Sequence, residues 1–338
     1  MNQSDAAELF EQLISNDPLK ASDVGADGGI CEHWMPFLNS MQVDAFEPNE
    51  KECAYRAGMS PPRITWFPIG LAKTSGEHTL YVPNRTSGAS LYPPNPYFME
   101  RFGCSAYWGE VKQFKIKCSS YQDFLSERKK TAPNLIKLDV QGAELDILSS
   151  FTDDQLNEVI CVETEVEFYE IYQGQPLFCD VHAFMVSKGF ELMDLRTARV
   201  HNSKGDVEDF YLKNELNTSR ATPHISAQLV GGDALYFRNT RGNDLFRSKN
   251  FLIKSVICAC IYHYYDLALW LIDQPQALKL FSNEEMSQLK TAIKKSAPKP
   301  RLRDRNDFIG RLIRKLRKKL RISDDMSIYW MKREWPNL

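Results

Sequence analysis

Acidic side chains follow two apolar runs that have the composition of buried strands. Asp139 comes directly after the first run, and Glu163 and Glu165 come directly after the second. A carboxylate so placed can take a proton from a bound hydroxyl, and His182, on an expected helix, could do the same. Each also has a structural explanation: Asp139 as the cap of the next helix, the two glutamates as an exposed strand end, and His182 as a partly buried surface residue.

The same acids could gather a divalent cation, because hard oxygen ligands suit Mg²⁺. The chain shows no recognisable ligand spacing, however, and its eight cysteines fall at neither a metal-binding nor a disulfide-framework spacing. Several cysteines lie in apolar runs, as Cys161 does, and are expected to be small buried hydrophobes in a reducing compartment. We therefore expect no metal-ligating residues.

A glycine-rich turn occupies residues 21–30, with the sequence Ala-Ser-Asp-Val-Gly-Ala-Asp-Gly-Gly-Ile. A short strand is expected to end at Val24, after which the chain turns and enters a helix that carries Trp34 and Phe37 on one side. Glycine permits the tight turn and leaves the backbone open to a ligand, and the amide groups at the helix start favour a polar or anionic ligand group. An ordinary strand-to-helix turn would look the same.

A second expected strand, over residues 42–46, ends in Glu47, which lies 24 residues after Asp23. An acid roughly 20 residues beyond a glycine turn is positioned to bind ribose hydroxyls in a doubly wound fold. The turn and the acid together predict a cofactor that contains a nucleoside.

Seven strands are expected to position these residues in one α/β sheet that is doubly wound and mostly parallel. They alternate with helical patterns, which is typical of a parallel sheet covered on both faces. Beyond the first two, the expected strands are 63–68, 134–139, 159–162, 189–195 and 234–237, and the expected helices include 5–14, 121–129 and 180–187.

Residues 1–245 are expected to form the sheet domain, and residues 246–338 a helical and basic C-terminal extension. The segment 72–110 is rich in Gly, Pro, Ser and Asn and is too long for a plain connection. We expect an insertion there, whose aromatic side chains either form a lid over an acceptor or pack the insertion onto the domain. The apolar run 256–272 contains His263 and other polar residues, so it predicts a buried helix rather than a membrane span.

The net charge of −2 hides an asymmetry: residues 290–321 contain 14 Lys and Arg against two acids, which leaves −14 for the rest of the chain. Residues 300–321 include apolar side chains at helical spacing and predict a basic amphipathic helix. That helix could lie on an anionic membrane surface, bind an anionic substrate or dock on the body of the protein. No nucleic-acid partner is expected, because no base-reading fold accompanies the charge.

Three segments together have a family pattern: Asp-Val-Gly-Ala-Asp-Gly-Gly at 23–29, Phe-Glu-Pro-Asn at 46–49, and Ile-Lys-Leu-Asp-Val-Gln-Gly-Ala-Glu at 136–144. On these segments the chain resembles the FkbM family of S-adenosylmethionine (SAM)-dependent methyltransferases. The family commonly has Glu where Gln141 stands, so that position is given no catalytic role. The resemblance covers roughly residues 19–238.

The resemblance implies a Rossmann-like, seven-stranded methyltransferase sheet and, usually, methyl transfer to oxygen. It places the methionine end of SAM at the glycine turn, the ribose at Glu47 and the adenine beside Ile69 and Gly70. The cofactor-binding residues that we expect are Asp23, Gly25, Ala26, Asp27, Gly29, Glu47, Pro48, Ile69, Gly70 and Asp139. Acceptors in the family include sugar hydroxyls of polysaccharides and glycolipids, and hydroxyls of secondary metabolites.

We therefore expect a cytoplasmic O-methyltransferase that acts on a sugar hydroxyl, with a peripheral position at the inner face of a membrane as an open alternative; the first 14 residues lack the pattern of a signal peptide. An NAD(P)-dependent oxidoreductase is the first alternative. It is disfavoured because Asp27 occupies the place of the second glycine in Gly-x-Gly-x-x-Gly. The other alternative is a non-catalytic scaffold that is recruited to membranes and retains the fold.

Overall fold

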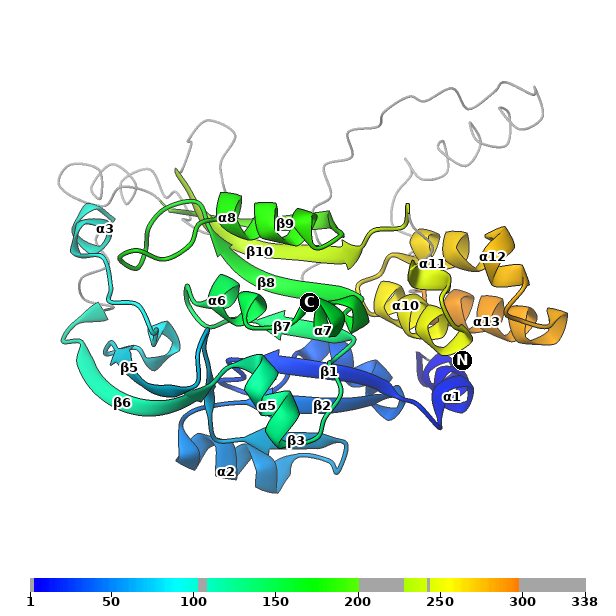
Figure 1. Cartoon of the computed structure of the whole chain (residues 1–338), viewed down its shortest axis with the longest axis horizontal. Helices are drawn as coiled ribbons and strands as arrows, with labels where there is room; N and C mark the ends of the chain where they lie inside the picture. Colours follow the sequence, from blue (N-terminus) through cyan, green and yellow to red (C-terminus); the bar gives the residue numbers. More distant parts are fainter. Residues whose placement is uncertain (1–2, 103–107, 201–227, 242–243, 298–338) are drawn as a thin grey trace, which may run out of the picture. The chain divides into compact units, whose positions relative to one another are not determined.

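The computed structural model describes residues 3–102, 108–200, 228–241 and 244–297 (Figure 1). Its central sheet has seven strands, in the spatial order β3-β2-β1-β7-β8-β10-β9. They span Leu19–Val24 (β1), Met41–Phe46 (β2), Ile64–Phe67 (β3), Leu135–Leu138 (β7), Cys161–Glu167 (β8), Phe190–Val200 (β9) and Gln228–Arg238 (β10). Strand β10 runs in the opposite direction to the other six strands of this sheet. The expected doubly wound, mostly parallel sheet of the methyltransferase type is confirmed.

Helices cover both faces of this sheet. On the face that carries Ala21, Leu135 and Cys161, the apolar side chains form one core, to which five helical elements contribute two or more buried side chains each. These are α1 (Gln3–Ile14), the 3₁₀ helix η1 (Glu32–Ser40), α10 (Lys249–Ile261), α11 (Tyr265–Ile272) and α13 (Asn283–Ser296).

The opposite face forms a second core around Phe46, Ile136 and Val162, to which three other helices contribute two or more buried side chains each. These are α5 (Tyr121–Glu127), α6 (Glu144–Ser149) and α8 (Phe178–Ser187). The remaining described helices are α2 (Glu50–Met59), η2 (Thr86–Gly88), α3 (Pro96–Arg101), α7 (Asp153–Glu158), η3 (Asp244–Phe246) and α12 (Pro275–Leu278).

The run 256–272 forms two helices rather than one; its first half is buried, as expected, whereas the second helix is buried on one side only and exposes Trp270. Helix α10 ends at Ile261 and α11 begins at Tyr265, because His263 has φ = +64° and interrupts the helical backbone. Every side chain from Phe251 to Ile261 is buried. Among the residues that the structure describes, no helix has both the length and the apolar character needed to cross a membrane.

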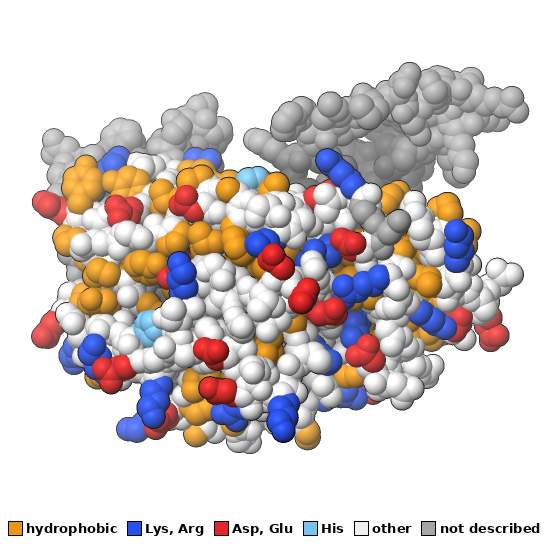
Figure 2. All heavy atoms as spheres, viewed as in Figure 1, with side chains coloured by type: hydrophobic (Ala, Val, Ile, Leu, Met, Phe, Trp, Pro, Cys, Tyr) orange, Lys and Arg blue, Asp and Glu red, His pale blue; other side chains and the backbone are white. Residues whose placement is uncertain are grey.

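Residues Met1–Ala297 form one compact unit. Helices α10, α11 and α13 thus share a core with the sheet, and the division that we predicted at residue 245 lies inside this unit. The predicted basic helix over 300–321 lies outside the described residues. On the described part of the face in Figure 2, basic and acidic side chains are interspersed.

A small second sheet has strands β4 (Gly70–Leu71), β5 (Gly76–Val82) and β6 (Lys112–Ser119) in the order β4-β6-β5; β5 lies within the expected insertion 72–110, and β4 and β6 flank it. In Figure 1 it lies at the left, at the opposite end of the molecule from α10 and α13. The insertion is tied to the loop after β8, since Asn95 N donates to Ile171 O at 2.9 Å and Gln173 N donates to Pro93 O at 2.8 Å.

Two expected elements differ in detail from those observed. Strand β8 continues to Glu167, so Glu163 and Glu165 lie within the strand and not in an exposed strand end. Antiparallel pairing with β10 extends the strand through this acidic stretch. The helix after the glycine turn is a 3₁₀ helix with Pro36 inside it, and its buried side chains are Trp34, Phe37, Leu38 and Ser40.

Candidate active site

The glycine turn after β1 is in direct backbone contact with the end of β7. Gly25 has φ = +81°, and a Cβ atom there would lie 1.9 Å from the carbonyl oxygen of Asp139, so glycine is required on both counts. The amides of Gly25 and Ala26 donate to the carbonyl oxygen of Phe46 at 3.2 Å. The turn thus joins the carboxyl ends of β1, β2 and β7, the edge at which open α/β sheets bind ligands.

Gly28 and Gly29 complete this turn with φ values of +88° and +118°. Gly29 N donates to Ala26 O at 3.1 Å, which closes the loop. Ala26 is buried, whereas the side chain of Asp27 is exposed. Four of the predicted residues, Gly25, Ala26, Asp27 and Gly29, therefore lie on one short loop, whose glycines have positive φ values that disfavour side chains.

Asp23 is the last polar residue of β1 and is almost fully buried. Its Oδ2 accepts a hydrogen bond from Cys31 N at 2.9 Å, whereas its Oδ1 lies 3.9 Å from Lys137 Nζ and has no hydrogen-bond partner. Burial raises the pKa of this carboxyl to about 6, although the Lys137 ammonium opposes the shift. A buried carboxylate oxygen without a partner fits a cationic donor from a ligand, such as the amino group of SAM.

Glu47 follows β2 and is held in place by its own backbone neighbour. Its Oε1 accepts a hydrogen bond from Asn49 N at 2.8 Å, and its amide donates to Phe67 O at 3.2 Å. Burial raises the pKa of the Glu47 carboxyl, the amide of Asn49 lowers it, and the nearby charge of Asp27 raises it further. Pro48 lies between Glu47 and Asn49, and Asn49 caps α2. Glu47 and Asp27 therefore lie close together beside the turn.

Ile69 and Gly70 begin the small sheet after β3. Gly70 pairs with Cys118 in β6, and a Cβ atom on Gly70 would lie 2.8 Å from the Cys118 sulfur. Ile69 packs against the second core. Their role beside an adenine stays a prediction.

Asp139 follows β7, with its side chain 44% exposed. Lys137 Nζ lies 3.2 Å from Asp139 Oδ2 and 3.9 Å from Asp23 Oδ1, so one ammonium interacts with the carboxylates of two predicted site residues. Burial lowers the pKa of Lys137, but the charges of Asp23 and Asp139 outweigh burial and raise it overall. No role could be assigned to Lys137 from the sequence; the structure places it on β7, with its ammonium near both Asp23 and Asp139.

Gln141 links Asp139 to Glu165. Its Nε2 donates to Asp139 Oδ1 at 3.1 Å and to Glu165 Oε2 at 2.5 Å. Its Oε1 accepts a hydrogen bond from the hydroxyl of Tyr172 at 2.9 Å, and its backbone has φ = +58°. An amide can bridge two carboxylates in this way because it offers two donor hydrogens, which an unprotonated glutamate lacks.

Glu163 lies in a different environment from Glu165, although both are on the same face of β8. Arg196 Nη2 lies 2.7 Å from Glu163 Oε1, and the hydroxyl of Tyr262 donates to Oε2 at 2.9 Å. His33 Nε2 lies 3.3 Å from the same Oε2. Burial raises the pKa of Glu163, but its partners His33, Arg196 and Tyr262 lower it overall. These surrounding donors therefore favour the ionised form of Glu163.

His182 lies on the opposite side of the sheet from these acids. Its Nδ1 lies 3.3 Å from the hydroxyl of Tyr236, and its ring stacks on Phe178. Tyr236 and its neighbour Val162 belong to the second core, whereas Glu163 and Glu165 point to the first face. The structure therefore does not bring His182 to Asp139.

A hollow of about 240 Å³ adjoins Glu165. Burial raises the pKa of both Glu165 and Glu167, and the charges of Asp139 and Glu144 raise them further. These carboxyl groups can therefore be protonated near neutrality and donate hydrogen bonds as well as accept them. Through Gln141, the hollow is connected to Asp139. Its lining residues are Glu165, Glu167, Ile171, Arg196, Thr197, Ala198, Val230, Gly231, Gly232 and Asp233.

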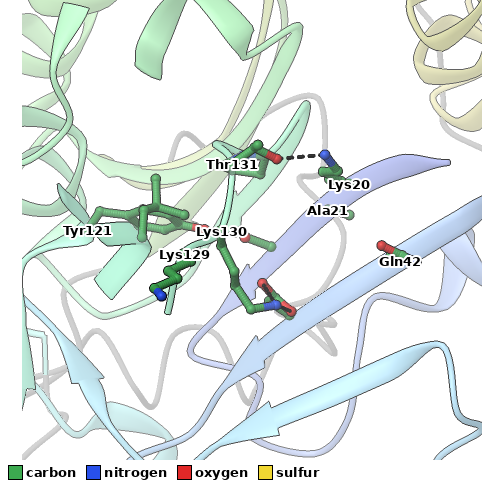
Figure 3. A pocket seen from close by; sticks show the side chains of 11 residues that line it. Lys20, Ala21, Gln42, Tyr121, Lys129, Lys130 and Thr131 are labelled. Carbon is green, nitrogen blue, oxygen red and sulfur yellow. Dashed lines mark hydrogen bonds and ion pairs between the residues drawn. The ribbon is translucent and has the colours of Figure 1, made fainter. Parts of the chain in front are cut away.

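A second pocket, of about 250 Å³, lies near the amino ends of β1, β2 and β7 (Figure 3). Two of its three lysines have partners, since Lys130 Nζ lies 2.8 Å from Asp44 Oδ1 and Lys20 Nζ donates to Thr131 Oγ1 at 2.6 Å. Ligands of open α/β sheets bind at the carboxyl ends of the strands, so we do not assign the active site to this pocket.

The aromatic residues of the insertion have separate surroundings. Trp108 is buried with its ring edge-on to Tyr172, and Phe98 is buried beside Phe102 and Tyr169. Tyr97 is 62% exposed. Trp108 and Phe98 therefore pack the insertion onto the domain, and the lid function remains a prediction.

The strand order, the single antiparallel strand and the glycine turn followed by an acid after β2 define a class I, SAM-dependent methyltransferase fold. A family model described as the methyltransferase FkbM domain matches residues 23–192, half of the chain, and the chain belongs to this family.

Among solved structures, the chain is similar to magnesium protoporphyrin IX methyltransferase from Synechocystis PCC 6803, at 9% identity and a TM-score of 0.30, over 70% of this chain and 79% of that chain. It is also similar to precorrin-6y C5,15-methyltransferase from Geobacter metallireducens, at 9% identity and a TM-score of 0.30, over 70% and 87%. No curated protein matches the chain.

The sequence interpretation missed four residues that complete the polar network: Cys31, His33, Arg196 and Tyr262. Cys31 and His33 stand just after the glycine turn, which was the one signal available for them. Arg196 and Tyr262 reach Glu163 from β9 and from the end of α10, which are remote in sequence. Only the folded chain brings them to one place.

Proposed function

We propose that this chain transfers the methyl group of SAM to the oxygen of a sugar hydroxyl in a glycan, glycolipid or related metabolite. The observation that carries the proposal is the continuous line of polar groups from Asp23 through Lys137, Asp139 and Gln141 to Glu165. It leads from the glycine turn to the hollow beside β8. The family match favours methyl transfer over the oxidoreductase alternative.

The residues at the turn fit SAM. The Oδ1 of Asp23, which has no hydrogen-bond partner, suits the amino group of its methionine end, and the turn at Gly25 leaves backbone open beside it. Glu47, at the end of β2, suits the ribose diol. When bound, SAM supplies an electrophilic methyl group for in-line displacement, so the main task of the protein is to position the acceptor.

The acceptor hydroxyl would bind between Asp139 and the hollow. Asp139 is half-exposed and is held by Lys137 and Gln141, so its carboxylate is oriented and accessible to a hydroxyl proton. Glu165, Glu167 and Asp233 offer carboxyl groups along the hollow, and sugar hydroxyls pair well with such groups. These features support a polar, hydroxyl-rich acceptor.

Binding and turnover of the full chain test the proposal together. Isothermal titration should show SAM binding, and Glu47→Gln should weaken it by about tenfold or more through loss of a charged hydrogen bond. Asp139→Asn should lower methyl transfer to sugar acceptors by about 10²-fold or more, and should weaken SAM binding by a smaller factor. Glu50→Gln, an exposed neighbour on α2, is the matched control for Glu47 and should change neither. Absence of SAM binding to the intact protein would refute the proposal.

A further inference from the structure

Three side chains of different chemistry meet beside the glycine turn. Cys31 precedes η1, His33 lies in its first turn, and Glu163 reaches them from β8. One ligand atom from each lies within 4.8 Å of the other two. Cys31 and His33 are partly exposed and Glu163 is buried, so an ion could enter from solvent and be held against the sheet.

The distances between these three ligand atoms are close to those in a tetrahedral zinc site. Cys31 Sγ lies 3.6 Å from His33 Nε2 and 4.0 Å from Glu163 Oε2, and His33 Nε2 lies 3.3 Å from Glu163 Oε2. With metal–sulfur bonds of about 2.3 Å and metal–nitrogen or metal–oxygen bonds of about 2.1 Å, a tetrahedron would separate sulfur from each other ligand by about 3.6 Å, and nitrogen from oxygen by about 3.4 Å. A shift of a few tenths of an ångström would complete the geometry.

The surroundings orient these ligands as outer-shell partners do in metal sites. Arg196 holds Glu163 Oε1, which leaves Oε2 directed at His33 and Cys31. Tyr262 donates to Oε2, and its hydroxyl lies 3.4 Å from the indole nitrogen of Trp34. Cys31 N is bound to Asp23, which fixes the loop that carries the sulfur. Hydrogen bonds of this kind preset ligand orientation and tune metal affinity.

We propose that Cys31, His33 and Glu163 bind a divalent transition-metal ion of the zinc type. A thiolate with an imidazole favours Zn²⁺ over Mg²⁺, and a thiolate with a carboxylate balances its two charges. Three protein ligands leave a fourth tetrahedral position for an oxygen ligand, as in catalytic zinc sites. The proposal departs from the sequence-based expectation of no metal-ligating residues, which rested on spacing alone; the three side chains are two and 130 residues apart and follow no sequence spacing.

Metal content of the purified full-length protein is the first test. After removal of bound metal with a chelator and reconstitution with Zn²⁺ alone, elemental analysis should find about one equivalent per chain. Co²⁺ should give the absorption of a tetrahedral thiolate complex. Cys31→Ser and His33→Asn should each weaken binding by about tenfold or more and remove the sulfur-dependent absorption in the first case. Glu163→Gln, which keeps the shape of the side chain, should weaken it as well.

Matched substitutions elsewhere serve as controls. Cys179→Ser changes an exposed thiol on α8, and His78→Asn changes an imidazole on β5; both should retain the metal. A reconstituted wild-type protein without metal overturns the proposal, and so does a Cys31→Ser, His33→Asn double variant that binds Zn²⁺ as tightly as wild type. Circular dichroism separates loss of metal from loss of fold.

Titration of the same samples with SAM keeps this inference distinct from the proposed function. Metal bound without SAM binding supports the site while refuting the methyltransferase proposal. If the protein binds SAM but takes up no Zn²⁺ or Co²⁺, the metal site is refuted and the methyltransferase proposal is supported.

Discussion

Single residues at the carboxyl edge of the sheet are held in surroundings that oppose their ionisation. Burial is the main cause of the raised pKa values of Asp23, Glu165 and Glu167. Glu163 differs because basic and hydroxyl partners surround it. A buried acid whose ionisation is disfavoured lowers the stability of the folded protein near neutral pH. Several such acids at one edge of the sheet therefore indicate a site that uses them for binding or proton transfer.

Asp23 gives a prediction with a definite sign. Its folded-state pKa of about 6 lies above its ordinary value of 3.8, so its contribution to stability is full below the ordinary value and is lost as pH rises through about 6. Asp23→Asn removes this loss. In urea unfolding without ligand, the variant should gain about 3 kcal/mol on wild type between about pH 4 and about pH 7.

The exposed Asp154 on α7 provides the control for this series. Asp154→Asn should leave the pH dependence of unfolding unchanged. A constant stability difference between wild type and Asp23→Asn over the same pH range would contradict the burial argument.

At the scale of elements, the turn between β1 and η1 positions the site because it touches β7. Gly25 is where the two backbones meet, with 1.9 Å between a hypothetical Cβ and Asp139 O. Gly25→Ala should therefore destabilise the protein by about 3 kcal/mol or more, from strain at positive φ and from separation of the strand ends. SAM binding should fall with it. Urea unfolding and calorimetric titration measure the two effects.

Gly58→Ala is the matched change in α2. Nothing lies within 4 Å of the Cβ position there. Alanine is the better helix former, so this variant should be more stable by about 0.5 kcal/mol. If Gly25→Ala behaved like Gly58→Ala, the turn would not be the rigid junction that the structure indicates.

The elements also show where sequence pattern is sufficient and where it is not. The seven strands and the glycine turn could be predicted, because apolar runs such as Leu135–Leu138 and the glycine spacing are local signals. The full length of β8 could not, since Glu163, Glu165 and Glu167 look like a strand end until β10 is seen to pair with them. The hydrogen bonds that Gln141 makes to two carboxylates, and the donors around Glu163, are likewise tertiary contacts that a local sequence pattern does not predict.

At the scale of the whole molecule, the C-terminal helices are part of the core rather than an accessory to it. Helix α10 contacts α1, η1, α11 and α13, and all eleven side chains from Phe251 to Ile261 are buried. Tyr262, directly after α10, also donates to Glu163 in the polar network. Packing and site geometry therefore both depend on residues that follow the sequence-predicted boundary at 245.

Two truncated chains distinguish these boundaries. A chain ending at Ala297 keeps the whole compact unit and should unfold cooperatively and bind SAM like the full chain.

A chain ending at residue 245 loses α10, and with it six large apolar side chains: Phe251, Leu252, Ile253, Val256, Ile257 and Ile261. At about 1.5 kcal/mol or more for each buried side chain, the loss of about 9 kcal/mol is comparable to the total stability of a typical domain. The shorter chain should therefore be insoluble or lack near-ultraviolet circular dichroism; if it instead folded and bound SAM, residue 245 would be a true domain boundary and the shared core would be dispensable.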